Sequence, residues 1–206
     1  KFNKDHWIIT LNNKDKAYFK NLILTCPFPQ LKNLGGKNLS KKILNLKPKM
    51  IANVTVMAVY KNYKIIPVNS IKFSDKIVAW AAHENTKNRF KSKQTLWTIQ
   101  CTETYSKKII NLFKKNKKKY QSLILKRFEN LTGYQTKNIV FQNMHGWKYA
   151  YSKKNTKLES ALHVSKKLGL CADWFSGSKA ENAWLSANSL YQKIKKNPRK
   201  IRGFNF

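Results

Sequence analysis

The stretch that decides the fold lies near the end of the chain and reads LGLCADWFSGSKAENAWLSA, residues 168–187. Its first residues predict a short buried strand, Asp173 and Gly177 mark a turn, and the remainder predicts an amphipathic helix. The start of a helix offers unpaired backbone N–H groups and the positive end of the helix dipole. A carboxylate on the turn can accept hydrogen bonds from hydroxyl groups. This strand–turn–helix therefore suits an anionic, hydroxyl-rich cofactor.

The composition is that of a folded but strongly basic chain. Its 206 residues are 42% hydrophobic and 13% aromatic, which is enough for one sizeable domain or two small ones. The net charge of +33 would normally indicate nucleic acid or an anionic membrane as partner. Lysine dominates, however, and arginine, the preferred residue for bidentate recognition of phosphates and bases, is scarce. Because asparagine, isoleucine, phenylalanine and tyrosine are also plentiful, an AT-rich genome explains the charge better than nucleic-acid binding.

The three cysteines, Cys26, Cys101 and Cys171, are far apart and have neither C-x-x-C pairing nor zinc spacing. We therefore expect small buried thiols in a protein of the reducing cytoplasm. No apolar run approaches the roughly 18 residues of a membrane span, and no signal-peptide pattern opens the chain. The first residue is Lys1. We therefore expect a cytoplasmic protein whose sequence here is a fragment of a longer or processed chain.

The first part of the chain predicts strands at residues 7–11 and 22–26, with a polar turn at 12–16. The second strand should stop at Pro27-Phe28-Pro29, since proline cannot continue a sheet ladder. A short helix is expected at 40–46. Further strands are expected at 54–60, 70–73, 77–82 and 95–102, a pattern typical of an antiparallel sheet of hairpins.

After residue 102, the spacing between apolar residues changes from that of strands to that of helices. Apolar spacings of three and four over residues 106–131 predict two helices, broken near Lys117, with Gly133 as the C-terminal stop. Residues 139–141 and 147–151 return to strand character. The last helix should run over 178–195, with a buried stripe made of Ala180, Ala183, Trp184, Ala187, Leu190, Tyr191 and Ile194.

Four segments together resemble the renalase-like NAD/FAD-dependent oxidoreductases, which are relatives of the flavin amine oxidases. The segments are LILTCPFPQ at 22–30, WAAHEN at 80–85, HGWKYA at 145–150, and the closing motif at 169–186. They occur in family order and span nearly all of this chain, but they correspond only to the C-terminal portion of the family. The closing motif is the most specific of the four.

Two departures from the family pattern stand out. Family members open with a G-x-G-x-x-G strand–turn–helix that places a pyrophosphate at a helix start, whereas this sequence contains no G-x-G. The expectation is therefore an incomplete chain without the N-terminal dinucleotide-binding motif. The family also usually has Gly-Asp where this chain has Ala172-Asp173. The alanine adds a methyl group where the backbone approaches the cofactor.

The resemblance implies a mixed α+β or α/β fold in two parts. A partial FAD-binding, Rossmann-like domain would comprise residues 1–30 (two strands) and 152–206 (strand, turn and helix). A substrate-binding domain, residues 31–151, would hold an antiparallel or mixed sheet with flanking helices.

The resemblance also assigns cofactor-binding residues. Asp173 would bind the ribityl hydroxyls or a nearby phosphate of FAD, and Gly177 would permit close approach of the chain. Thr25 and Pro27 would form a turn near the flavin edge. The complete cofactor set is Thr25, Pro27, Asp173, Trp174, Gly177 and Ala183. No catalytic residue is assigned, because hydride transfer needs a shaped, water-poor site while the redox chemistry belongs to the cofactor.

An aromatic and polar cluster is the candidate for substrate binding, through stacking surfaces and orienting hydrogen bonds. Its members are Trp80, His83, Asn85, Trp147 and Tyr149. Trp80 and Trp147 are equally compatible with a place in the sheet core, and a histidine such as His83 is more often structural.

The leading hypothesis is part of an FAD-dependent oxidoreductase that transfers a hydride from a reduced nicotinamide or an amine to flavin. Its partners would be FAD and that small-molecule substrate, with no metal, no specific nucleic acid and no membrane. Two alternatives stay open: a basic nucleic-acid-binding protein, motivated by charge alone, and a degenerate non-catalytic relative, motivated by the missing dinucleotide motif.

Overall fold

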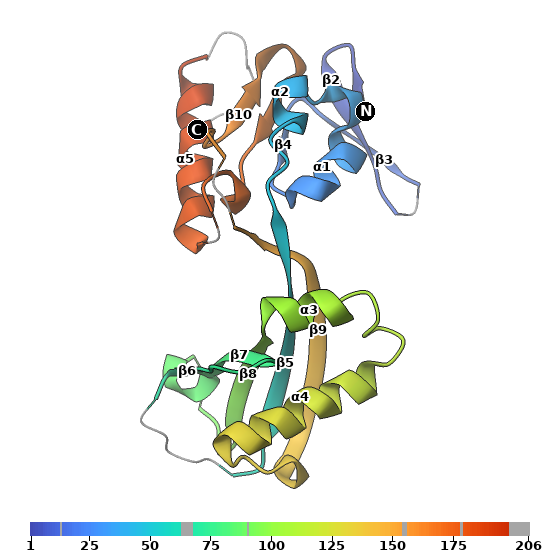
Figure 1. The fold of residues 1–206 in the computed structure, drawn as a ribbon. Coiled ribbons are helices and arrows are strands. Elements are labelled where there is room, and N and C mark those ends of the chain that lie inside the picture. The colour runs from blue at the N-terminus through green and yellow to red at the C-terminus, as the bar shows by residue number, and fades with distance from the viewer. Residues whose placement is uncertain (13, 63–67, 90, 154–155, 178, 198–206) are drawn as a thin grey trace. The chain divides into compact units, whose positions relative to one another are not determined.

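The computed structural model describes residues 1–197 apart from 13, 63–67, 90, 154–155 and 178. It divides into two compact units (Figure 1). Unit 1 combines Lys1–Met50 with Tyr151–Phe206, and unit 2 is Ile51–Ala150. Each unit has its own apolar core. The division of the chain into an FAD-binding and a substrate-binding domain stays a prediction.

A five-stranded sheet forms the centre of unit 2, in the order β6-β7-β8-β5-β9. Its strands are β5 (Met50–Tyr60), β6 (Ser70–Lys72), β7 (Val78–His83), β8 (Thr95–Cys101) and β9 (Ile139–Ser152). The pairs β6–β7, β7–β8 and β5–β8 are antiparallel. The four strands predicted between residues 54 and 102 are confirmed. The two predicted at 139–141 and 147–151 are parts of the single strand β9.

Two helices cover one face of this sheet, α3 (Glu103–Ile109) and α4 (Lys117–Thr132) (Figure 1). Thr102 begins α3, since its hydroxyl accepts a hydrogen bond from the backbone N–H of Tyr105 at 3.2 Å. Gly133 ends α4 in the left-handed conformation, φ 76°, as predicted. Trp97 of β8 and Phe128 of α4 meet in the buried core between the sheet and these helices.

Unit 1 contains two small sheets. One is the antiparallel meander β1 (Phe2–Asn3), β2 (His6–Thr10) and β3 (Lys16–Phe19). The other has the order β10-β11-β4, from β4 (Leu22–Leu24), β10 (Ala161–His163) and β11 (Leu168–Leu170). Strand β11 is antiparallel to β10 and parallel to β4. The two strands predicted at 7–11 and 22–26 both form, but they belong to different sheets.

Three helices flank the β10-β11-β4 sheet: α1 (Phe28–Gly35), α2 (Lys41–Leu44) and α5 (Ala180–Lys195). Leu31 of α1 and Ile43 of α2 pack with Trp7 and with Leu168 and Leu170 of β11. On the opposite face, α5 packs Leu190 and Ile194 near Cys171. Short 3₁₀ turns complete the fold: η1 (Gly36–Asn38), η2 (Glu84–Lys87), η3 (Thr136–Asn138), η4 (Val164–Lys166) and η5 (Asp173–Phe175).

The predicted buried stripe of α5 is only partly correct. Leu190 and Ile194 are buried, but Trp184 is 66% exposed and the three alanines of the stripe, at 180, 183 and 187, are exposed. The buried side instead uses the hydroxyl of Ser186, which bonds to backbone groups of unit 1. Residue 178, where we expected the helix to begin, lies outside the described residues.

All three cysteines are free thiols; Cys101 and Cys171 are buried and Cys26 is half-buried. Burial raises the pKa of each thiol, that of Cys101 to about 12. Within the described part of the chain, no helix is both long and apolar enough to cross a membrane.

Candidate cofactor site

The candidate cofactor site begins where β11 ends beside β4. The two strands run parallel in the register Leu168↔Leu22 to Leu170↔Leu24, so their carboxyl ends lie at the same edge. The backbone N–H of Cys171 continues the pairing by donating to the carbonyl of Leu24 at 3.3 Å. The turns that follow the two strands therefore leave the sheet together. In open α/β sheets, this carboxyl edge is where ligands usually bind.

Asp173 opens the turn after β11 and is half-buried. Its Oδ1 accepts the backbone N–H of Trp174 at 2.8 Å, and its carbonyl accepts the N–H groups of Ser176 at 3.0 Å and Gly177 at 2.9 Å. The residues that the structure describes make no further hydrogen bond to the carboxylate. One carboxylate oxygen thus organises the turn while Oδ2 remains able to accept a ligand hydroxyl.

Gly177 links this turn to α5. Its φ of 127° is a conformation that a residue with a Cβ adopts only with strain, so glycine is required here. Helix α5 starts at Ala180, and the side chain of its N-cap residue, Lys179, makes no capping hydrogen bond. Glu181 lies in the first turn, where a carboxylate interacts favourably with the helix dipole.

Ser186 fixes the position of the turn relative to α5. Its buried hydroxyl donates to the carbonyl of Glu159 at 2.5 Å and accepts the backbone N–H of Ala172 at 3.0 Å. Ala172 immediately precedes Asp173, so this hydroxyl holds the backbone from which the carboxylate projects. The sequence reasoning missed Ser186, although a serine among the apolar positions of a predicted helix is a detectable signal.

Trp174 is a buried structural member of the site, and its assignment to the cofactor stays a prediction. Its side chain is 1% exposed and its indole N–H donates to the carbonyl of Cys26 at 3.1 Å. The ring stacks on Phe175 at 3.9 Å and meets Phe28 edge-on at 5.3 Å. Trp174 therefore joins the turn after β11 to the turn after β4. The structure thereby brings the Thr25–Pro27 turn and the Asp173 turn into one neighbourhood.

The other predicted cofactor residues take different positions. Thr25 is exposed just beyond β4, and Pro27 is the N-cap of α1, where proline suits a helix start. Ala183 lies exposed on α5, two turns from the buried Leu190.

The turn from Asp173 to the start of α5 has groups that match the chemistry of FAD. The half-buried Asp173 has an acceptor oxygen to offer, Gly177 holds the turn in a conformation that favours glycine, and the N-cap of α5 makes no side-chain cap. Hydroxyl groups and an anionic phosphate are complementary to these features. The residues at this turn therefore fit the ribityl and phosphate portion of the cofactor.

In unit 2, three of the five candidate substrate residues share the sheet face away from the helices. A Cβ on Gly146 would collide with Phe113 and Ile110, next to α3, so Gly146 faces the helices. Its neighbour Trp147, 55% exposed, therefore points to the opposite face, as does Tyr149. Trp80 precedes the buried Ala81, a member of the helix-covered core, and so also lies on the open face.

His83 and Asn85 do not join this group. His83 is fully buried and stacks at 5.0 Å on Trp97, which in turn contacts Phe128 of α4. Burial lowers the pKa of His83, because the protein interior disfavours the imidazolium. Asn85 connects two backbone segments, since Nδ2 donates to Gln94 O at 2.8 Å and Oδ1 accepts Leu96 N–H at 2.9 Å. Both residues therefore have structural contacts within unit 2, and their assignment to substrate binding stays a prediction.

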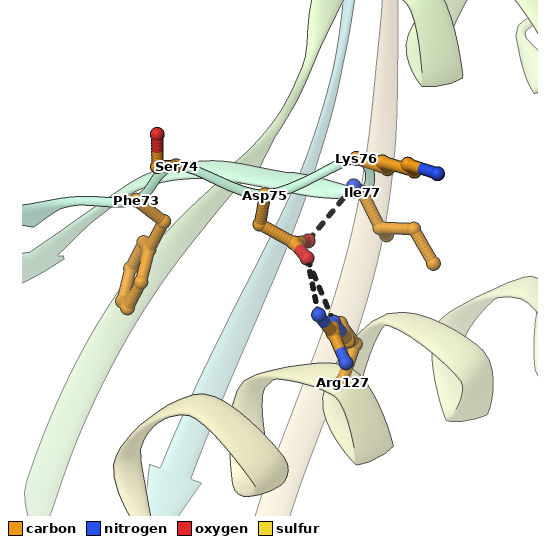
Figure 2. Close-up of a pocket in the computed structure, with 6 residues that line it drawn as sticks. All are labelled: Phe73, Ser74, Asp75, Lys76, Ile77 and Arg127. Atoms are coloured by element: carbon orange, nitrogen blue, oxygen red, sulfur yellow. Dashed lines mark hydrogen bonds and ion pairs between the residues drawn. The ribbon is translucent and has the colours of Figure 1, made fainter.

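Unit 2 also has an open hollow of about 820 Å³, shown in Figure 2. Its lining comprises Phe73, Ser74, Asp75, Lys76, Ile77 and Arg127. Asp75 Oδ2 accepts two hydrogen bonds from Arg127, at 2.8 and 2.6 Å, while Oδ1 accepts the N–H groups of Ile77 and Val78. Burial alone would raise the pKa of Asp75, but these donors outweigh it and hold the pKa well below its usual range. Since the charges of Asp75 and Arg127 neutralise each other, their ion pair has a structural role: it holds the turn before β7 against α4.

Comparison with known proteins finds likeness in structure but not in sequence. No family model matches the chain, and no curated protein matches it. A putative protoporphyrinogen oxidase from Exiguobacterium sp. 255-15 has a similar structure, with a TM-score of 0.66, 10% identity and 95% of this chain covered. An engineered putrescine oxidase matches with a TM-score of 0.62 and 9% identity over 95% of this chain. Wild-type putrescine oxidase bound to putrescine matches with a TM-score of 0.59 and 8% identity over 94% of this chain.

The likeness establishes the fold. This chain has the mixed α+β fold found in these oxidases, with antiparallel and mixed sheets and flanking helices, as predicted. The matched region is only 45% of the Exiguobacterium protein and 47% of the putrescine oxidases. The chain therefore spans less than half the length of the solved structures that it resembles.

Proposed function

We propose that this chain forms part of an FAD-dependent oxidoreductase that takes a hydride from a reduced nicotinamide or an amine. The observation that carries the proposal is the Trp174–Cys26 hydrogen bond, which joins the Asp173 turn to the Thr25–Pro27 turn in a flavin-oxidase fold. Both turns are assigned to the cofactor by the same family resemblance. Their proximity supports a single shared site.

In unit 1, Asp173 would hold the ribityl hydroxyls through Oδ2, because its Oδ1 is already committed to the turn. Gly177 would let the backbone approach a phosphate oxygen, and the start of α5 would favour its negative charge. Ser186 would position Asp173 through the backbone of Ala172. Bound FAD would supply the hydride-accepting group.

In unit 2, the open sheet face would contribute to substrate binding. Trp80 and Trp147 offer flat apolar surfaces there, and the His145 ring lies 4.3 Å from that of Trp147. Met57 is 40% exposed between the core residues Val56 and Ala58, which places it on the same face. Aromatic surfaces of this kind suit a planar donor such as a nicotinamide ring.

The test begins with the complete natural polypeptide that contains these residues. We expect it to purify with visible flavin absorbance, or to gain that absorbance when FAD is added. Asp173→Asn should weaken FAD binding by about tenfold, as expected for loss of one charge-assisted hydrogen bond. Asp15→Asn is the matched control, because this exposed carboxylate of unit 1 lies between β2 and β3, outside the Asp173 turn and α5; it should bind FAD like the parent.

A second measurement addresses the substrate. Anaerobic mixing with NADH, NADPH or a primary amine should bleach the flavin absorbance for one class of donor. Trp147→Ala should then slow the bleaching while FAD affinity stays unchanged. A complete chain that purifies colourless and binds no added FAD would refute the proposal, as would equal FAD affinity of the parent and Asp173→Asn.

A further inference from the structure

Lysines are concentrated in the two helices that cover the sheet of unit 2. Seven of the thirteen residues 107–119 are lysine and none is acidic, whereas fewer than one residue in five is lysine over the whole chain. All seven are exposed: two belong to α3, two to the segment between the helices, and three to the first turn of α4. Genome composition explains an excess of lysine throughout the chain, but it does not explain this concentration in one place.

On α4 the exposed side chains point away from the sheet. Lys119, Leu123 and Lys126 are exposed and follow one another at spacings of four and three residues, which places them along one side of the helix. With 3.6 residues per turn, that side is opposite to Phe128, which is buried in the core between α4 and the sheet. Lys126 also forms an ion pair with Glu129 at 3.1 Å.

Helix α3 has the same orientation. The hydroxyl of Ser106 accepts the backbone N–H of Val54 in β5 at 3.0 Å, so this side of α3 faces the sheet, as does the buried Ile109. Lys107 is exposed on the side of α3 opposite to Ile109. Because α3 and α4 cover the same face of the sheet, their lysines lie in one outer layer of unit 2 (Figure 1).

These lysines do not stabilise the helix that they begin. The start of a helix carries the positive end of its dipole and therefore favours acidic side chains. Helices α3 and α5 have Glu103 and Glu181 in this position, whereas the first turn of α4 has no acidic residue and its N-cap, Asn116, makes no side-chain capping hydrogen bond. Lys117 reaches Asn143 of β9 at 2.8 Å. The other lysines are suited to an anionic partner outside the chain.

Two exposed leucines lie among the lysines. Leu112, 49% exposed, belongs to the segment between the helices, and Leu123, 48% exposed, follows Lys119 by one turn of α4. Aliphatic side chains of this kind can insert at the boundary between the headgroups and the acyl chains of a bilayer, while lysines around them contact anionic headgroups. The outer layer thus combines the two features by which a protein surface binds anionic lipid.

Nucleic acid is less well matched to this layer. Single strands are bound by aromatic rings that stack on bases, and bases are recognised by arginine. Phe113 and Phe128 are buried, however, and Tyr120 is half-buried. Arg127, the one arginine of α4, already forms its ion pair with Asp75.

We propose that the outer layer of α3, α4 and the segment between them binds the surface of a bilayer that contains anionic phospholipids. The lysines lie at the lipid phosphates, and Leu112 and Leu123 insert among the headgroups. Groups of four to eight basic residues on an amphipathic helix bind anionic lipids in this way. The inference goes beyond the proposed function, because it rests on a surface of unit 2 and requires no cofactor.

The experiment mixes the complete natural polypeptide that contains these residues with sedimentable vesicles of phosphatidylcholine, with or without about 30% phosphatidylserine. We expect the protein to sediment with the phosphatidylserine vesicles and to remain in solution with phosphatidylcholine alone. Raised salt should release it, because salt screens the attraction between exposed charges.

A quadruple variant tests which lysines are responsible, and it leaves the Lys117–Asn143 bond intact. It combines K114Q, K115Q, K118Q and K119Q. Since each lysine near an anionic surface contributes about fivefold in affinity, this variant should bind the phosphatidylserine vesicles roughly a hundredfold more weakly. The matched control loses the same charge from exposed lysines of unit 2 outside the two helices and should bind like the parent; it combines K72Q, K91Q, K93Q and K137Q.

Two further measurements separate binding from folding. The urea midpoint of unit 2 in the quadruple variant should equal or exceed that of the parent, because positive charges leave the positive end of the α4 dipole. L112Q keeps every lysine, so its affinity should fall about fivefold while its salt dependence stays that of the parent.

The proposal is overturned if the parent binds both kinds of vesicle equally or neither kind, if the quadruple variant binds like its control, or if L112Q binds like the parent. It is also overturned if RNA or duplex DNA displaces the protein from phosphatidylserine vesicles at equal phosphate concentration, since the surface would then be one for nucleic acid. Because no flavin measurement enters, these outcomes are independent of whether the flavin proposal holds.

Discussion

The buried hydroxyl of Ser186 joins two backbone segments that would otherwise have unpaired polar groups. We expect Ser186→Ala to lower the free energy of unfolding of unit 1 by about 1–3 kcal/mol, because it leaves the buried N–H of Ala172 without its acceptor. Chemical denaturation would measure the change, with the exposed Asn188→Ala on the same helix as a control. Equal stability of the two variants would contradict the role given to this hydroxyl.

Asp75 makes unit 2 sensitive to acid. Its folded-state pKa lies below the ordinary value of about 3.9, so its ion pair contributes stability above that value and loses it as pH falls through the folded pKa. We expect the urea midpoint of unit 2 to fall as pH decreases below about 4. Asp75→Asn should have a lower midpoint at neutral pH and a shallower decline in acid.

The control for this titration is Glu181→Gln, which changes a carboxylate in unit 1. Its unit 2 midpoint should follow the pH dependence of the parent. If Asp75→Asn retained the full acid dependence, the carboxylate of Asp75 would not be its source.

At the scale of elements, β9 packs against the segment after α3 through a glycine. A Cβ on Gly146 would overlap the ring of Phe113. Gly146→Ala should therefore destabilise unit 2 by about 1–3 kcal/mol, as overpacking of a core does. The second change Phe113→Leu should recover part of the loss by freeing space, and thermal unfolding of the single and double variants would show it. A fully stable Gly146→Ala would mean that β9 and the segment after α3 separate at little cost.

The strands of unit 2 could be predicted from the sequence because their signal is local. Val56 and Ala58 alternate with Thr55 and Met57, and turn residues such as Asp75 separate the runs. Helix α1 was missed for an equally local reason. Pro27 and Pro29 were interpreted only as the end of a strand, yet proline is also well suited to the first turn of a helix.

The parts of the candidate site that could not be predicted depend on contacts between distant residues. Nothing near Trp174 in the sequence indicates that its indole would bond to Cys26, 148 residues away. Helix α5 was predicted correctly, but part of its predicted buried stripe was wrong. The spacing of Trp184 and its neighbouring alanines predicted burial, whereas these side chains are exposed, because which side of a helix is covered depends on what packs against it. The sequence of one chain does not contain that information.

For the whole molecule, two separate cores predict two separate cooperative units. Phe128→Ala removes a fully buried ring from the core of unit 2 and should cost about 3–5 kcal/mol. Amide hydrogen exchange should accelerate in β5, β7 and β8, while β4 and β11 of unit 1 keep their parental rates. Equal acceleration in both sets of strands would show that the chain opens as one unit.

The shielded sulfur atoms have a practical consequence for such work. Alkylating reagents react with thiolates, and raised thiol pKa values keep Cys26, Cys101 and Cys171 protonated at neutral pH. The native protein should therefore react slowly with maleimides. Two cysteines introduced on the surface, one in each unit, could then carry fluorescent or spin probes without first removing the natural three, so distances between the two units could be measured in solution.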